Sequence, residues 1–304
     1  MATSTTLTTT STGDGHWDDA LRAAAAFLAG FRSADTRKGY KRDRSCWLEF
    51  CAAHQLHPYV GVRRTHVEVY LRQLEQQVPA LANSTLRRRI STLASWFTWL
   101  EDEEISVGNP AARVRRPRRH SRPQPWLDRN ELTDLLAAGE DEGSYPYALV
   151  CLLGLNGLRV SEACSPDVGD LGGARYQPTL RIIGKGDKPA EVPLNPRTHE
   201  AIDQALAGRT DGPLLLNRWG NRMQRHNAAV IVTRLARRIG IERRVTPHAL
   251  RRSYITIGLL QGVPLREMQR AARHTRADTT VAYDQSDRSF LRDPTFVLMT
   301  ATAR

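Results

Sequence analysis

The chain from Trp17 to about Ala112 places its apolar residues at helical spacing, which predicts a region built only from helices. We expect one helix to open at Ser33, a second to cover residues 65–76, and a third to start at Asn83 and Ser84, which are good N-cap residues. The third helix shows the period of about 3.6 residues most clearly, in Leu86, Ile90, Leu93, Phe97 and Leu100.

From Trp126 onward the pattern mixes helices with two short strands. Residues 179–183 and 191–194 are typical of strands, and the glycine-containing segment between them predicts a β-hairpin. Before the hairpin we expect a helix from Asp128, its N-cap, to Ala138, and one long apolar helical region from Pro146 to Cys164. After it, helices are expected over residues 197–207, 226–239, 246–261, 265–273 and around 279–284. The fold class is therefore mainly α with one small antiparallel β-sheet.

Six arginines stand among the ten residues from Arg113 to Arg122, and Pro117 interrupts the run. We do not expect such a segment to pack as a core element, so we place a domain boundary there. Nine of the first twelve residues are Ser or Thr, which indicates a disordered tail. The expected organisation is a tail over 1–16, a helical domain over 17–112, a basic linker over 113–125, and a second domain with a C-terminal tail over 126–304.

The formal net charge of +12 favours a polyanionic partner, either nucleic acid or an anionic membrane surface. The longest apolar stretch, residues 147–158, is far shorter than the roughly 20 residues that span a bilayer, so no membrane is expected. Residues 17–124 hold 19 basic against 11 acidic residues, which concentrates the surplus in the helical domain and its linker. A solvated linker is the ordinary interpretation of an arginine run, but one that joins two basic domains favours DNA phosphate contacts. The candidate DNA-binding residues are Arg87, Arg88, Arg113, Arg115, Arg116, Arg118 and Arg119.

The four cysteines form no CxxC pair, and two of them lie in apolar runs. Buried free thiols in a reducing cytoplasm are the expected interpretation. The sequence also offers no His/Cys cluster with metal-ligand spacing. We therefore expect neither a metal nor another cofactor.

Five features of the second domain carry side chains suited to phosphate chemistry. Each has an ordinary structural explanation when taken alone, such as an Arg159–Glu162 ion pair, a solvated turn lysine or a core tyrosine. Along the chain they follow one another in a fixed order: an arginine beside apolar neighbours, a lysine in the hairpin turn, His-x-x-Arg, a second histidine, and Thr-Thr-x-x-Tyr. The candidate catalytic residues are Arg159, Lys185, His248, Arg251, His274 and Tyr283.

In this order and spacing the chain resembles the tyrosine recombinases, the family of phage integrases and Xer-type recombinases, from about Thr36 to Tyr283. It departs from the family pattern at Arg252, where the family usually has His, and at Arg273, where it usually has Gly. The resemblance implies a two-domain clamp around duplex DNA, and recombination by four protomers on two sites. The apolar tail after Tyr283 then docks either on a neighbouring protomer or on its own domain.

The residue types fit a transesterification at phosphorus. Arg159 and Arg251 can present planar N–H forks to the non-bridging phosphate oxygens, and His274 can add a further hydrogen bond. Tyr283 is the expected nucleophile, with His248 accepting its proton. Lys185 is expected to protonate the leaving 5′-oxygen, and Lys188 in the same turn is its rival. The resemblance implies the same assignments.

The expected function is site-specific DNA recombination in integration or excision, through a 3′-phosphotyrosine and without metal or ATP. Three alternatives remain open: a Xer-like resolvase of replicon multimers, a type IB topoisomerase activity, and a non-catalytic DNA-binding protein on the same scaffold.

Overall fold

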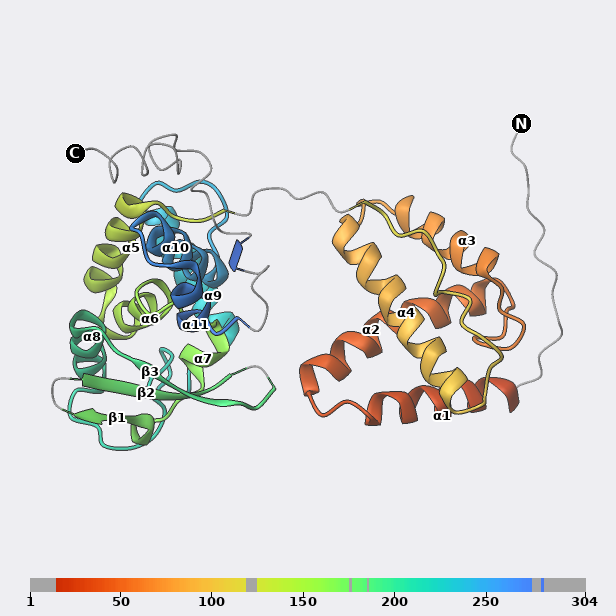
Figure 1. Ribbon diagram of the computed structural model, residues 1–304, viewed down its shortest axis with the longest axis horizontal. Helices are drawn as coiled ribbons and strands as arrows, with labels where there is room; N and C mark the ends of the chain where they lie inside the picture. Colours follow the sequence, from red (N-terminus) through yellow and green to blue (C-terminus); the bar gives the residue numbers. More distant parts are fainter. Residues whose placement is uncertain (1–14, 119–124, 175–176, 185, 275–279, 282–304) are drawn as a thin grey trace, which may run out of the picture. The chain divides into compact units, whose positions relative to one another are not determined.

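The computed structural model describes residues 15–118, 125–174, 177–184, 186–274 and 280–281. The chain divides into two compact units, with the division after residue 122 (Figure 1). The first unit contains α1 Gly15–Ala29, α2 Ala34–Ala53, α3 Arg64–Glu75 and α4 Asn83–Asp102. The second contains α5 Arg129–Glu142, α6 Ser144–Gly154, α7 Val160–Cys164, the 3-10 turn η1 Val168–Asp170, β1 Leu171–Ala174, β2 Gln177–Ile183, β3 Pro189–Pro193, α8 Pro196–Leu206, α9 Arg225–Arg238, α10 Pro247–Leu260 and α11 Leu265–Ala271.

Aromatic side chains fill the core of the helical first unit. Trp47 of α2 and both Trp96 and Phe97 of α4 are almost completely buried. Trp47 packs edge-on against Phe97, and its indole N–H donates to the Pro58 carbonyl at 2.9 Å, so its polar atom is paired inside the core. The expected helical region from Trp17 onward is therefore confirmed.

The helix starts in this unit follow local capping chemistry only in part. Ser33 is the N-cap of α2, as predicted, and its Oγ accepts from the Thr36 N–H. The prediction that Asn83 and Ser84 cap α4 is wrong, because the N-cap is Ala82, which has no side-chain acceptor. The Asn83 amide instead donates to the Arg118 carbonyl at 3.1 Å, a contact that is distant in sequence.

The start of the arginine run packs on the first unit, contrary to the expectation that it joins no core. Val114 is 5% exposed and belongs to the core of the helical unit. Arg87 of α4 donates to the Pro117 carbonyl at 2.8 Å. The run is not uniformly polar, so Val114 anchors it while Arg113, Arg115 and other arginines stay exposed.

The second unit is built around α6, in which every residue from Tyr147 to Gly154 is buried. Helices α5, α8 and α10 pack against it, and the three-stranded antiparallel sheet has the order β1-β2-β3 (Figure 1). In the predicted hairpin, Leu180 pairs with Val192, and both point into the core. The expected fold class, mainly α with a small antiparallel sheet, is confirmed.

Two predictions for this unit need correction. The region from Pro146 to Cys164 is not one helix, because the chain turns at Gly157, which has φ +59°, between α6 and α7. Strand β1 was not predicted, since its sequence Leu-Gly-Gly-Ala has no strand propensity and its pairing with β2 alone defines it. The short helix expected around residues 279–284 falls mostly outside the described residues.

All four cysteines are free thiols; Cys46 is half-buried, and Cys51, Cys151 and Cys164 are buried. Burial raises the pKa of the Cys151 and Cys164 thiols to about 12, so both are protonated and inert at neutral pH. Across the described part of the chain, no helix is both long enough and apolar enough to cross a membrane.

Candidate active site

The turn between α6 and α7 positions Arg159. Gly157 has φ +59°, a conformation that side-chain-bearing residues rarely adopt, and an added Cβ would lie 2.2 Å from Cδ1 of Tyr254. Glycine therefore lets the backbone turn directly against the Tyr254 ring. Arg159 follows as the N-cap of α7, with its side chain 31% exposed.

Glu162, which is 1% exposed, is the acceptor that organises the site. Its Oε2 accepts from the Arg159 backbone N–H at 2.9 Å, and its Oε1 accepts from Arg159 Nη1 at 2.5 Å. Arg273 Nη2 donates to Oε2 at 2.7 Å, and Arg251 Nη1 lies 4.0 Å from the same oxygen. Burial opposes the charged carboxylate most strongly, but the Arg159 N–H, the Arg273 charge and the guanidinium hydrogen bonds outweigh it and lower the pKa of Glu162. One ionised carboxylate thus gathers three guanidinium groups.

Arg251 comes from α10, whose first residue, Pro247, needs no hydrogen-bond partner for its nitrogen. Thr246 is the N-cap, as predicted, although its side chain makes no capping hydrogen bond. Arg251 is 1% exposed, and its side chain donates to the carbonyls of Gly157 and Ala272. Its guanidinium therefore ties the α6–α7 turn to the end of α11.

His248 and Arg251 lie three residues apart on α10, as the sequence predicts. His248 is exposed to solvent. Desolvation by the surrounding protein lowers the pKa of His248, and the positive charges of Arg252, Arg251 and Arg159 lower it further. The imidazole is thus neutral at neutral pH and able to accept a proton.

His274 lies three residues after the end of α11, within range of the Arg251 and Arg159 charges. Desolvation, followed by the charges of Arg251 and Arg159, lowers the pKa of His274 to about 4. Its Nδ1 lies 2.9 Å from the Thr280 hydroxyl. The predicted residues Arg159, His248, Arg251 and His274 are therefore brought together from three parts of the chain.

Arg273 was not predicted to belong to the site, and it is the position where the resemblance leads to an expectation of Gly. The structure explains that preference, because Arg273 has φ +53°. A left-handed conformation costs a non-glycine residue roughly 1 kcal/mol or more. Besides the bond from its side chain to Glu162, the Arg273 carbonyl accepts from Arg159 Nη2 at 3.2 Å. No sequence signal pairs residue 273 with residues 159 and 162, which lie more than a hundred positions away.

Lys185 and Tyr283 lie outside the described residues, so neither side chain is placed. The hairpin that carries Lys185 is described on both sides, and the Gly184 N–H donates to the Lys188 carbonyl at 2.8 Å. A Cβ on Gly184 would lie 3.9 Å from Oε1 of Glu162, so the base of this hairpin is adjacent to the cluster.

The predicted DNA-binding arginines of the first unit differ in their surroundings. Arg88 forms an ion pair with Asp43, which is buried and also accepts from the Thr92 hydroxyl at 3.1 Å. Arg88 therefore has a structural partner within its own unit, as Arg87 does. Arg119 lies outside the described residues, whereas the remaining candidates are exposed: Arg113, Arg115, Arg116 and Arg118.

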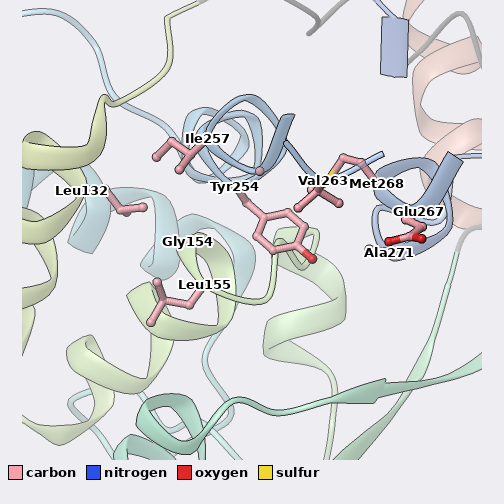
Figure 2. A pocket seen from close by; sticks show the side chains of 10 residues that line it. Leu132, Gly154, Leu155, Tyr254, Ile257, Val263, Glu267, Met268 and Ala271 are labelled. Atoms are coloured by element: carbon pink, nitrogen blue, oxygen red, sulfur yellow. The ribbon is translucent and has the colours of Figure 1, made fainter. Parts of the chain in front are cut away.

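An apolar surface pocket of about 400 Å³ lies between α6, α10 and α11, with the ring of Tyr254 at its side (Figure 2). Leu132 and Leu155 line it opposite Val263 and Met268. Desolvation raises the pKa of Tyr254, and the opposing charges of Arg273 and Arg251 do not reverse the shift. None of the four described catalytic candidates lines this pocket.

Among the described residues, no three His, Cys, Asp or Glu side chains gather in a way that could hold a metal ion. The positive charge of the site comes instead from guanidinium groups. Three such groups around one carboxylate leave a net positive cluster beside two neutral histidines, which suits a singly charged phosphodiester.

Comparison with known proteins relates both units to phage integrases. Residues 125–289 match the model of the phage integrase family, and residues 26–104 match the N-terminal SAM-like domain of phage integrases. A tyrosine recombinase of Pseudothermotoga lettingae is 32% identical over 228 residues, which cover 73% of this chain and 77% of the relative. Tyrosine recombinase XerC of Pelotomaculum thermopropionicum is 30% identical over 272 residues, which cover 83% and 87%.

Solved structures share the fold at lower identity. A lambda integrase (75–356) dimer bound to a COC′ core site is 15% identical, with a TM-score of 0.72 and coverage of 91% of this chain and 97% of that chain. XerH site-specific recombinase bound to palindromic difH substrate is 17% identical, with a TM-score of 0.70 and coverage of 87% and 80%. From the family models and the sequence relatives together, this chain belongs to the phage integrase family and is a tyrosine-type site-specific recombinase.

Proposed function

We propose that Arg159, Arg251 and His274 bind the scissile phosphate and that Tyr283 attacks it. The observation that carries this proposal is that Arg159 and Arg251 converge on Glu162 from separate segments, with His248 and His274 within range of the charges of both arginines. The Arg159 and Arg251 guanidiniums stabilise the charge that builds on the non-bridging oxygens as phosphorus becomes five-coordinate. In neutral His274, donation from the Thr280 hydroxyl to Nδ1 would put the ring proton on Nε2, ready to donate to the same phosphate.

The proton movements assign the remaining roles. Neutral His248 accepts the proton of the Tyr283 hydroxyl as its oxygen bonds to phosphorus, and Lys185 protonates the 5′-oxygen as its bond to phosphorus breaks. The products are a 3′-phosphotyrosine and a free 5′-hydroxyl. Attack by another 5′-hydroxyl reverses these steps and joins a new strand, so the cycle needs neither metal nor ATP.

The partner is double-stranded DNA; in support, the lambda integrase dimer is bound to a COC′ core site and XerH to a difH substrate. The helical domain, the basic linker and the exposed arginines of residues 113–118 supply phosphate contacts outside the catalytic centre. The assembly that recombines two sites is a homotetramer, with the tail after Tyr283 exchanged between protomers. The reaction takes place in the cytoplasm on nucleoid DNA, in integration or excision. Relatives named XerC favour, as a second candidate, a Xer-like role in resolving replicon multimers.

The test is covalent capture on DNA. The full chain is incubated in EDTA, without nucleotide, with a library of nicked duplexes of random sequence, and protein–DNA adducts that survive detergent are sequenced. Wild type should yield adducts that share one cut position, and Tyr283→Phe should bind DNA without forming them. Tyr254→Phe is the matched control, because it keeps the ring that packs on Gly157 and should still form the adduct.

The alternatives give different results in the same assay. An adduct that persists in Tyr283→Phe but disappears in Tyr254→Phe would reassign the nucleophile. DNA binding with no adduct in wild type would favour the non-catalytic DNA-binding protein. Relaxation of supercoiled plasmid without exchange between two captured sites would favour a type IB topoisomerase activity.

A further inference from the structure

We propose that Arg273 is a positioning residue of this recombinase, which fixes the Arg159 guanidinium through Glu162 and through its own backbone carbonyl. The inference deepens the proposed function, because it takes Arg159 to be a phosphate-binding group. Arg273 stands where the resemblance leads to an expectation of glycine, so its side chain is a feature of this chain that the catalytic set does not include.

The contacts hold Arg159 at both ends of its fork. Nη1 of Arg159 donates to Oε1 of Glu162 at 2.5 Å, and Nη2 donates to the Arg273 carbonyl at 3.2 Å. Arg273 Nη2 donates to the other Glu162 oxygen, Oε2, at 2.7 Å. The acceptor that orients Arg159 is therefore itself held by the Arg273 side chain, which is only 18% exposed.

Arg273 also balances the charge of the carboxylate. Arg251 Nη1 is 4.0 Å from Oε2, beyond hydrogen-bond range, and the Arg251 fork donates to two backbone carbonyls. Without the Arg273 guanidinium, Arg159 becomes the chief cation against the buried Glu162 and is drawn toward it. With Arg273 in place, Glu162 orients Arg159 while more of the Arg159 charge is left for a phosphate.

The backbone conformation separates this role from a purely structural one. Residue 273 has φ +53°, so Arg273→Gly relieves the backbone strain but removes the guanidinium. Arg273→Ala removes the guanidinium and keeps the strain. Arg273→Lys keeps both a positive charge and the strain. Thermal stability should therefore rank Arg273→Gly above Arg273→Ala. If Arg273 is a positioning residue, the rate of strand cleavage should depend on whether the variant keeps a positive charge at position 273, and not on its thermal stability.

The experiment measures both quantities in the full chain. Single-turnover adduct formation is followed at saturating concentration of the duplex recovered by covalent capture, and thermal unfolding is recorded for each variant. Arg273→Gly and Arg273→Ala should both cleave at least tenfold more slowly than wild type at unchanged DNA affinity, and Arg273→Lys should recover much of the rate. Arg266→Ala, which removes an exposed arginine of α11, is the charge-matched control and should cleave like wild type.

A second readout does not depend on cleavage. Guanidinium signals of Arg159, assigned by their loss in Arg159→Lys, are followed by NMR in arginine-labelled protein without DNA. In Arg273→Gly the Arg159 guanidinium signals should shift from their wild-type positions, because the fork is then drawn toward Glu162. Unchanged signals there, or cleavage rates that follow thermal stability with glycine near wild type, would overturn the role of Arg273. If neither wild type nor Arg266→Ala forms an adduct, the proposed function is overturned. The NMR signals then still decide the role of Arg273.

Discussion

Glu162 accepts a hydrogen bond from the backbone N–H of Arg159 at 2.9 Å and another from the guanidinium of the same residue at 2.5 Å. The first bond satisfies an N–H at the start of α7, and the second orients the fork, so one carboxylate couples the helix start to the direction of a catalytic candidate. Because Glu162 is buried, this coupling cannot be replaced by water.

Glu162→Gln should separate cleavage from DNA binding. The amide keeps the shape of the side chain but leaves the Arg159, Arg251 and Arg273 charges uncompensated, so we expect a stability loss of about 3 kcal/mol. Cleavage should fall more than tenfold, while DNA affinity stays equal or rises because a negative charge near the phosphate is gone. Thermal unfolding, filter binding and adduct formation measure these effects, with Glu267→Gln on the exposed side of α11 as control. Weaker DNA binding in Glu162→Gln at full cleavage rate would contradict this account.

The sequence was sufficient for features that rest on local rules. Helical periodicity predicts α4, Asp128 as N-cap predicts the start of α5, and the Gly-flanked turn predicts the β2–β3 hairpin. The break at Gly157 was missed, because the run from Pro146 to Cys164 stays apolar through it and only the Tyr254 ring requires the glycine.

The residue types of the candidate site were predictable from the sequence, but most of the contacts between their side chains were not. The i,i+3 spacing of Arg159 and Glu162 suggested their ion pair, because neighbours at that spacing share one helix face. The Glu162–Arg273 pair spans 111 positions, and only the folded chain brings its members together. Arg88 was predicted as a DNA contact from its charge alone; its ion pair with buried Asp43 could not be predicted, because it depends on how α2 meets α4.

The fall of the cleavage rate at acidic pH should report the protonation of His248. A general base acts when neutral, so a lowered pKa of His248 keeps the enzyme active to a pH below the ordinary histidine value of about 6.5. After desolvation, the largest contribution is the Arg252 charge, which does not contribute to the lowered pKa of His274. Arg252→Gln should therefore shift the acidic limb to higher pH. Single-turnover rates between about pH 5 and pH 8 measure it; an unmoved limb would remove His248 as the base.

The exposed arginines that follow α4 should carry part of the DNA affinity. Arg115→Ala with Arg116→Ala removes two exposed charges, and each lost phosphate contact lowers the log–log salt slope by about 0.9. Binding should weaken for all sequences alike, since phosphate contacts do not read bases. Arg22→Ala, which removes an exposed arginine paired with Asp19 on α1, is the control. A slope equal to that of the control would mean that the run is simply solvated.

Lys185 is the proposed general acid, and its role has a chemical signature. The base of its hairpin lies beside the cluster, since a Cβ on Gly184 would be 3.9 Å from Glu162 Oε1. A 5′-alkoxide is a poor leaving group and gains greatly from a proton donor, whereas a thiolate leaves well without one. Replacing the bridging 5′-oxygen at the cut by sulfur should therefore restore cleavage to Lys185→Ala.

Two matched variants make this sulfur test specific. Arg159→Ala should stay slow on the sulfur substrate, because the charge on the non-bridging oxygens remains uncompensated. Lys188→Ala tests the other lysine of the turn, whose carbonyl accepts from the Gly184 N–H, a backbone contact that the substitution leaves in place. Rescue of Lys188→Ala in place of Lys185→Ala would make Lys188 the general acid. Rescue of neither would move proton donation to another group, with His248 the next candidate, and the base that activates Tyr283 would then have to be sought elsewhere.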